Sequence, residues 1–360
     1  MPELWIPYGS VETLITIQAE NLGAVSDAAP EAGAMDSERV AELAKGASKM
    51  FICDGTPATV EVLKGLTPTL GELQGKAFFS AAPKRVESAV PELKGRISTL
   101  PPPLRQGDGG EPMFSPELSA PGSKLFLGSA RPDPLFGLVD ARVEACLNWV
   151  SRGKSGAKKE MEPSPLRKTE AYESMESFAA RIPDSKFLTV VPRGGRARVT
   201  LEDAPFDAVK NAFAKVPMAP ARGIVIGSGG RGYDDTLSAA IRGVWNVIEG
   251  VRKAGSILLV AECTEGMGST ALEMLVTGRL EEVRRRSVEG LEDVFYLNKL
   301  KEEYDMLLLS GLPETYASSK LGFATAKGSG EAVGRILNKV GRSGKVNVIP
   351  RAAECVVESG

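Results

Sequence analysis

The stretch between Arg222 and Gly268 contains a glycine spacing that can hold phosphate groups. Gly227, Gly229 and Gly232 follow the spacing G-x-G-x-x-G directly after the apolar run 224–226. Behind a buried strand, this spacing predicts a dinucleotide-binding loop. The amides of such a loop can also hold a more general anion. A glycine turn that only lets a helix and a strand pack closely would have the same sequence, so all three interpretations remain open.

Two further residues favour the general anion over the dinucleotide. Arg231 lies inside the loop, beside Gly230, and supplies a positive charge. A dinucleotide site also needs an acidic residue at the end of the next strand, about 20 residues on. Glu262 ends that strand, but it comes later in the sequence than this pattern prefers.

The sequence contains no histidine, which removes the side chain most often used for proton transfer at neutral pH. No imidazole can act as an acid, a base or a metal ligand. The four cysteines are dispersed, without C-x-x-C pairs, so we predict no metal site. We expect them to be buried and reduced, which indicates the cytoplasm.

The loop is positioned by a predicted strand–helix–strand unit. The run 224–226 predicts a strand, Asp234 and Asp235 suit the beginning of a helix, and helical spacing of apolar residues continues to Val251. Gly255 would end the helix before a second strand at 257–261. Such a unit implies a right-handed parallel crossover, with the glycine loop at the carboxyl edge of the sheet.

The rest of the chain follows the same α/β pattern. We predict two α/β domains with mainly parallel sheets flanked by helices, the second beginning near Pro205, and a ligand cleft between them. A Pro-, Gly- and Ser-rich loop is expected at 101–121. The predicted strands lie at 50–53, 77–80, 125–128, 187–191, 197–200, 306–310 and 346–349, after a hairpin at 4–17, and the predicted helices at 36–49, 271–285 and 331–340.

Composition narrows the classes of partner. The 360 residues carry a net charge of −2, and Lys and Arg are scattered among Asp and Glu, which argues against nucleic acid. No apolar run approaches the roughly 20 residues of a membrane helix. The start of the chain does not have the shape of a signal peptide.

Several motifs resemble those of one enzyme family. The segment 228–234 is similar to an A-G-G-Y-P-K-D loop, and 261–268, AECTEGMG, is similar to A-E-C-x-E-G-x-G. The opening residues 6–9, IPYG, are similar to L-P-Y-G. On these motifs the chain resembles the LarA family of lactate racemases, which use a nickel-pincer nucleotide cofactor. The resemblance implies domains at 1–203 and 204–343, with the strand in 344–360 completing the first domain.

The departures from the family fall on its functional positions. Asp54 and Thr56 match the family's phosphate-holding D-x-T-R-P loop, but its Arg is missing. Lys84 stands at the position of the first family histidine, with Arg85 retained after it. Arg142 stands at the position of the second histidine. At the family spacing Arg152 replaces the lysine that carries the cofactor, and Lys154 matches it only after a two-residue shift. In the second-domain helix, Ala239 and Arg242 replace a Gln and a Lys that face the substrate.

These departures change the expected chemistry. Racemisation in the family needs a general base on each face of the substrate carbon. Arg142 stays protonated and cannot serve, and Lys84 would need a strongly lowered pKa. We therefore do not expect the chain to be a competent lactate racemase. The resemblance implies a nickel-pincer nucleotide cofactor, but we expect neither this nucleotide nor another cofactor to be bound.

Two functional hypotheses follow. The first is a binding protein for a small anionic ligand (a hydroxy acid, a phosphate or a nucleotide). Such a protein could form a homo-oligomer. Its ligand would lie in the interdomain cleft, near Asp54, Thr56, the glycine loop and the cations Arg85, Arg142, Arg231 and Arg242. The second is an isomerase or oxidoreductase that acts on a 2-hydroxy acid, with Lys84 or Lys154 as the base. A solvated lysine favours the binding protein, and a buried lysine of lowered pKa favours the enzyme.

Overall fold

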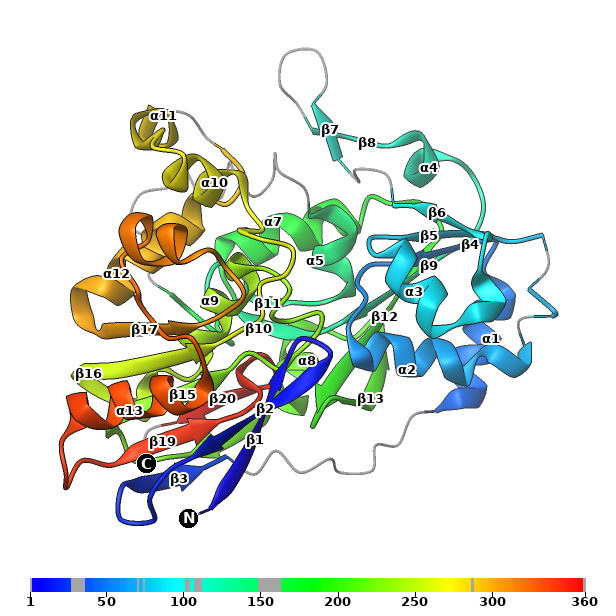
Figure 1. Ribbon diagram of the computed structural model, residues 1–360. Helices are drawn as coiled ribbons and strands as arrows, with labels where there is room; N and C mark the ends of the chain where they lie inside the picture. Colours follow the sequence, from blue (N-terminus) through cyan, green and yellow to red (C-terminus); the bar gives the residue numbers. More distant parts are fainter. Residues whose placement is uncertain are drawn as a thin grey trace.

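Two parallel-dominated sheets form the framework of the protein, as seen in a computed structural model (Figure 1). The structure describes residues 2–26, 36–69, 71–73, 75–100, 104–106, 112–147, 163–285 and 288–358. Each of the two sheets has six strands, and the predicted α/β class with mainly parallel sheets is confirmed.

The first sheet is parallel except at one edge, where β13 runs antiparallel to β12. The predicted strand at 125–128 is buried along its whole length, because this strand lies in the middle of the sheet between two helical layers. In spatial order the strands are β13 (Arg196–Glu202), β12 (Ser185–Arg193), β9 (Lys124–Ser129), β4 (Lys49–Ile52), β5 (Ala77–Ser80) and β6 (Ile97–Thr99).

The second sheet is parallel throughout. Its central strands are the apolar runs on either side of the glycine loop. In spatial order the strands are β18 (Ala324–Thr325), β17 (Asp305–Leu309), β16 (Val251–Val260), β15 (Ala221–Gly227), β19 (Val346–Ile349) and β3 (Leu22–Val25).

Helices cover both faces of each sheet. The outer face of the first sheet packs against α1 (Ser37–Gly46), α2 (Pro57–Gly65) and α3 (Pro83–Ala89). The outer face of the second sheet is covered by α13 (Ser329–Val340) together with the hairpin of β1 (Glu3–Tyr8) and β2 (Val11–Thr16). The predicted opening hairpin is thus confirmed.

A single large core joins the inner faces of the two sheets. The helices α5 (Ala141–Cys146), α7 (Glu170–Ala179), α9 (Leu237–Asn246) and α12 (Leu291–Glu303) contribute to it, and α5, α7 and α9 lie near the centre of Figure 1. Because this core is continuous, the carboxyl ends of strands from both sheets are brought together.

The terminal strands lie in or against the second sheet. The strand near Val346, which the resemblance assigned to the first domain, is β19, and it lies between β15 and β3. Since β3 falls within the range predicted for the first domain, that assignment stays a prediction. The first residues of the chain also join the second sheet, since β1 and β2 cover its face. The boundary proposed at 203/204 stays a prediction.

The helix after the glycine loop is shorter than its apolar spacing suggested. Thr236, not Asp234 or Asp235, caps α9, its side chain accepting a hydrogen bond from the amide of Ala239. The helix ends at Asn246, and Val251, predicted as helical, begins β16 instead. The predicted helix at 271–285 is likewise divided into α10 (Thr270–Val276) and α11 (Leu280–Arg285), with Gly278 at positive φ between them.

Short elements complete the chain. Within the predicted loop at 101–121, β7 (Leu104–Gln106) pairs with β8 (Pro112–Phe114), and α4 (Pro116–Ser119) follows. Two further pairs are β10 (Arg131–Asp133) with β11 (Gly137–Val139), and β14 (Ala214–Pro217) with β20 (Cys355–Glu358).

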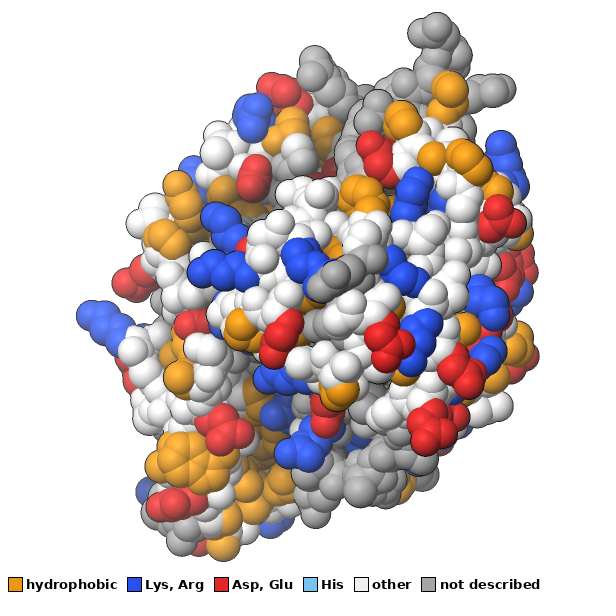
Figure 2. Space-filling model, turned by 90° about the vertical axis from the view of Figure 1, so that its right-hand side faces the viewer, with side chains coloured by type: hydrophobic (Ala, Val, Ile, Leu, Met, Phe, Trp, Pro, Cys, Tyr) orange, Lys and Arg blue, Asp and Glu red, His pale blue; other side chains and the backbone are white. Residues whose placement is uncertain are grey.

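The surface has no evident preference for one sign of charge on the face shown in Figure 2, where Lys and Arg alternate with Asp and Glu. None of the helices in the described part of the chain is long and apolar enough to cross a membrane. All four cysteines are buried and free, and burial raises the pKa of the thiol of each.

Candidate functional site

A cavity of about 220 Å³ lies where the two sheets meet. The loops after β4 and β9 form one wall, and the glycine loop and α9 form the other, so the cavity is at the carboxyl ends of parallel strands, where α/β folds bind ligands. We call it the cleft cavity. It is lined by Asp54, Thr56, Arg131, Pro132, Glu144, Gly232, Tyr233, Thr236, Ser238, Ala239, Arg242, Gly243, Asn246, Gly268 and Ala353.

Asp54 and Thr56 were predicted at this site, and they lie together at its wall. Asp54 Oδ1 accepts hydrogen bonds of 2.8 Å from both the amide and the hydroxyl of Thr56. Asp54 Oδ2 accepts a hydrogen bond from the amide of Ser129, at the end of β9. Asp54 therefore ties the ends of two neighbouring strands together, and both of its oxygens already have protein partners.

Arg131 and Glu144 form an ion pair of 2.6 Å in the cavity wall. Burial opposes the charge of each group, which raises the pKa of Glu144, while the charge of Arg131 lowers it. The guanidinium of Arg131 also lies in the field of Asp133 and Asp54. The sequence reading missed this pair. Its only signal was the charged run Arg-Pro-Asp at 131–133, separated by two residues from the predicted strand at 125–128.

Arg242 lies in the cavity wall, but acidic side chains already surround it. Its guanidinium donates to Asp133 Oδ2 at 3.1 Å, to Glu292 Oε1 at 2.8 Å and to Asp293 Oδ1 at 2.8 Å. Asp293 also accepts a hydrogen bond from Ser238 at 2.7 Å. The two acids of α12 and Asp133 are essentially inaccessible to solvent. We call Arg242, Asp133, Glu292 and Asp293 the Arg242 cluster.

The lining residues of the cleft cavity carry two carboxyl and two guanidinium groups, and the acids behind Arg242 add further negative charge to its surroundings. Burial and then the charge of Asp293 raise the pKa of Glu292 to about 8, which favours its protonated form. Even so, the remaining carboxylates outnumber the two guanidinium groups. The carboxyl groups are Asp54, Asp133, Glu144, Glu292 and Asp293, and the guanidinium groups are Arg131 and Arg242.

The glycine loop packs against the protein's own backbone. A Cβ atom on Gly227 would lie 2.4 Å from a side-chain carbon of Ile6 and 2.5 Å from the carbonyl oxygen of Pro350. A Cβ atom on Gly230 would meet Pro7 at 3.0 Å, and one on Gly232 would meet Thr56 at 3.0 Å. Close packing, the least specific of the three interpretations, therefore accounts for these glycines.

Gly227→Ala should destabilise the protein. The added methyl group would push the opening hairpin or Pro350 away from β15, which costs about 1–3 kcal/mol for overpacking of this kind. Urea unfolding measures the change. Gly330→Ala is a matched control, because a Cβ atom there meets nothing within 4 Å. Equal stability of the two variants would contradict the packing role of Gly227.

The predicted cations of the loops have different environments. Arg85 pairs with Asp235 and lies 3.2 Å from Glu265, so it joins the two halves of the protein. The side chain of Arg231 is exposed, and its amide donates to the carbonyl of Gly9 at 2.8 Å. Neither side chain is among those that line the cleft cavity.

Of the remaining predicted residues, Lys84 and Arg142 also lie away from the cavity. Lys84 is exposed at the start of α3. Arg142, near the beginning of α5, lies 3.7 Å from Glu176 of α7. Lys154 and Arg152 are outside the described residues. Among the described lining residues, the cavity therefore contains no lysine and no cation without a carboxylate partner.

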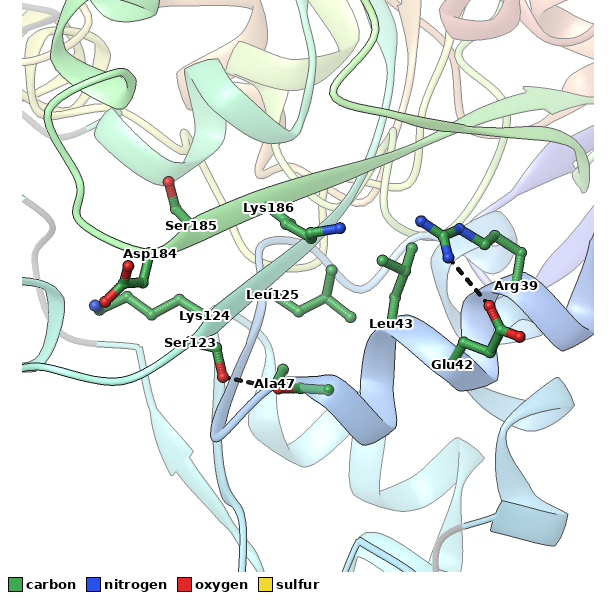
Figure 3. Close-up of a pocket in the computed structure, with 11 residues that line it drawn as sticks. Arg39, Glu42, Leu43, Ala47, Ser123, Lys124, Leu125, Asp184, Ser185 and Lys186 are labelled. Atoms are coloured by element: carbon green, nitrogen blue, oxygen red, sulfur yellow. Dashed lines mark hydrogen bonds and ion pairs between the residues drawn. The ribbon is translucent and has the colours of Figure 1, made fainter.

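Another cavity, of about 390 Å³, lies at the opposite end of the first sheet (Figure 3). Its cations have partners as well. Arg39 pairs with Glu42 and Glu202, and Lys186 pairs with Glu202. The ammonium of Lys124 donates to the carbonyls of Gly122 and Pro183. This cavity is therefore lined by acidic as well as basic side chains, and we assign it no ligand.

Comparison with known proteins shows the fold. No protein-family model and no curated protein matches the sequence. The lactate racemase apoprotein from Thermoanaerobacterium thermosaccharolyticum has a similar structure, with a TM-score of 0.69 and 15% identity over 99% of this chain and 100% of that chain. A structural-genomics protein from Thermotoga maritima is also similar, with a TM-score of 0.61 and 13% identity over 90% of this chain and 98% of that chain. At these identities the similarity concerns the fold and not the activity.

The described residues around the cleft cavity do not fit the nickel-pincer nucleotide implied by the family resemblance. Asp54 accepts hydrogen bonds from Thr56 and Ser129, and a Cβ atom on Gly232 would lie 3.0 Å from Thr56, so the two loops approach each other closely beside the cavity. A volume of about 220 Å³ is also below the ~300–1,000 Å³ usual for larger ligands. Among the described residues, no cluster of Cys, Asp and Glu could hold a metal ion.

Proposed function

We propose that this chain is a non-racemising protein of the LarA fold that binds a small polar metabolite in the cleft cavity. The observation that carries the proposal is a cavity of about 220 Å³ at the carboxyl ends of parallel strands, lined by buried ionic side chains. Such groups are costly to bury and are retained in clefts where they contact ligands.

The proposal that racemisation is absent rests on the side chains available. Proton abstraction on both faces of a substrate carbon needs two bases of suitable pKa. The chain has no histidine, and Lys84 at the first family position is exposed to solvent. Arg142 cannot lose its proton at working pH, and it lies near Glu176.

The charge of the cleft changes the expected ligand. A simple anion, as predicted from the sequence, would meet an excess of carboxylates there, because Arg131 and Arg242 are already paired. A ligand that donates hydrogen bonds or carries an ammonium group fits this balance better. We therefore propose a small amine or zwitterion, with the ammonium group near Asp54 and Glu144.

Calorimetric titration with ethanolamine, serine and lactate tests the proposal, alongside chiral analysis of lactate supplied with the nickel-pincer nucleotide. We expect an ammonium compound to bind, lactate to bind at least about tenfold more weakly, and no interconversion of D- and L-lactate. Glu144→Gln should weaken binding of the ammonium compound, whereas Glu331→Gln, a change at the exposed partner of Arg335, should not. Tighter binding of lactate, or its racemisation, would overturn the proposal.

A further inference from the structure

A separate pocket of about 340 Å³ lies at the amino edge of the second sheet, far along the strands from the cleft cavity. We call it the edge pocket. The strands β3, β15 and β19 are neighbours there, and their first residues line it together with the loop that precedes β19. The lining residues are Gly23, Ala24, Ala219, Pro220, Ala221, Arg222, Arg252, Ser343, Gly344, Lys345 and Asn347.

All three charged residues of the edge pocket are cations. Arg222, Arg252 and Lys345 are exposed, and no acidic residue is among those lining the pocket. Within the described part of the chain, none of the three forms an ion pair. Arg252 donates to the carbonyl of Pro220 at 3.0 Å, and Lys345 to the carbonyl of Leu22 at 3.1 Å. Unlike the cleft cavity and the cavity of Figure 3, the edge pocket therefore has no carboxylate among its lining residues.

The wall of the pocket is rigidly built, although its cations are exposed. Asn347 is buried and lines the pocket, and its amide nitrogen donates to the carbonyls of Ala219 and Gly250 at 3.0 and 2.9 Å. Its side-chain oxygen accepts from the amide of Ala24 at 2.9 Å. One side chain thus fixes β3, β15 and β16 relative to β19, and the cations of these strands are held at one place.

We propose that the edge pocket binds a phosphate group of a small molecule. Three like charges in one pocket repel one another, and an anion with several acceptor oxygens removes that repulsion. Arg222 and Arg252 provide planar guanidinium donors, which suit the paired oxygens of a phosphate. Ser343 and the loop backbone add neutral polar groups beside them. This site is distinct from the cleft and does not depend on the function proposed for it.

The same cations could instead stabilise a helix end, and the experiment must distinguish that role from phosphate binding. They lie near the end of α13, and positive side chains stabilise the carbonyl end of a helix. That role predicts a loss of stability when they are removed, with no phosphate affinity at all. Phosphate binding predicts affinity that falls with each cation removed and with added salt.

Calorimetric titration of the full chain with inorganic pyrophosphate and with ADP provides the experiment. We expect both to bind, with each of Arg222→Gln and Lys345→Gln lowering the association constant about tenfold. Lys339→Gln is the matched control, since Lys339 lies on α13 but pairs with Asp305 at 3.0 Å outside the edge pocket. Stronger binding of ADP than of pyrophosphate would identify a nucleotide, and the reverse a free phosphate compound.

Two results would overturn the proposal. One is the absence of pyrophosphate binding to the unmodified protein at millimolar concentration, and the other is equal binding by the Arg222→Gln and Lys339→Gln variants. Arg252→Gln gives an independent measurement should either variant fail to fold. Asp54→Asn changes the cleft alone, so unchanged pyrophosphate binding by that variant separates the two sites.

Discussion

Arg242→Met lowers the free energy of unfolding by about 3–5 kcal/mol, the range observed when one partner of a buried ionic group is removed. The guanidinium of Arg242 compensates the charges of Asp133 and Asp293 and donates a hydrogen bond to Glu292, and all three acids are buried. Methionine fills a similar volume but leaves these carboxyl groups without a cation. Urea unfolding at neutral pH measures the loss.

A matched control is Arg335→Met on α13. Arg335 also forms an ion pair, of 2.7 Å with Glu331, but both side chains are exposed. Exposed pairs of this kind contribute about 0.3–0.5 kcal/mol. The loss of unfolding free energy caused by Arg242→Met should also be smaller in acid, because protonated carboxyl groups carry no charge for a cation to compensate. Similar losses in the two variants would show that Arg242 is not essential to its cluster.

The sheets were the part of the fold that sequence patterns predicted well. Runs such as Ile257–Val260 are apolar at every position because both faces of the strand are buried, and this signal is entirely local. The partner of an edge strand has no such local signal. The register of β19 against β3 depends on contacts such as Val346 with Leu22, more than 300 residues apart in the sequence, so local patterns could not place β19 beside β3 in the second sheet.

The helix boundary after the glycine loop failed for a related reason. Ile248 and Val251 continue the helical spacing of apolar residues, but β-branched residues of this kind are equally suited to strands. Val251 becomes part of a strand because it pairs with Ala221 in the neighbouring strand, which is a long-range contact. Periodicity alone could not locate the end of α9.

Only part of the candidate site could be predicted from the sequence. Asp54, Thr56 and Arg242 were predicted near the cleft, and all three line its cavity. The acids that determine its charge are distant in the sequence, with Asp133 separated from Arg242 by 109 residues and Asp293 by 51. Without those contacts Arg242 resembles a free cation, which is why an anionic ligand was expected.

The stability of the unmodified protein should fall as pH rises from about 4.5 to about 8, owing in part to Glu292. The pKa of Glu292 is raised from 4.5 to about 8 by burial first and then by the charge of Asp293. Below the unfolded-state pKa, both states are protonated and the contribution is fully present. As pH rises through the folded-state pKa, the buried carboxyl must ionise, and the contribution is lost.

Glu292→Gln tests this directly, because glutamine keeps the shape of the protonated carboxyl group and cannot ionise. We expect the variant to match the unmodified protein near pH 5 and to be the more stable of the two near pH 9, so that its stability declines less with pH. The decline should not vanish, since burial also raises the pKa of Asp140, Glu144, Asp234 and Glu354. Urea unfolding across this range, with Glu331→Gln as the exposed control, provides the measurement. Identical pH profiles for Glu292→Gln and the unmodified protein would show that Glu292 is ionised throughout, and the cleft would then be more negative still.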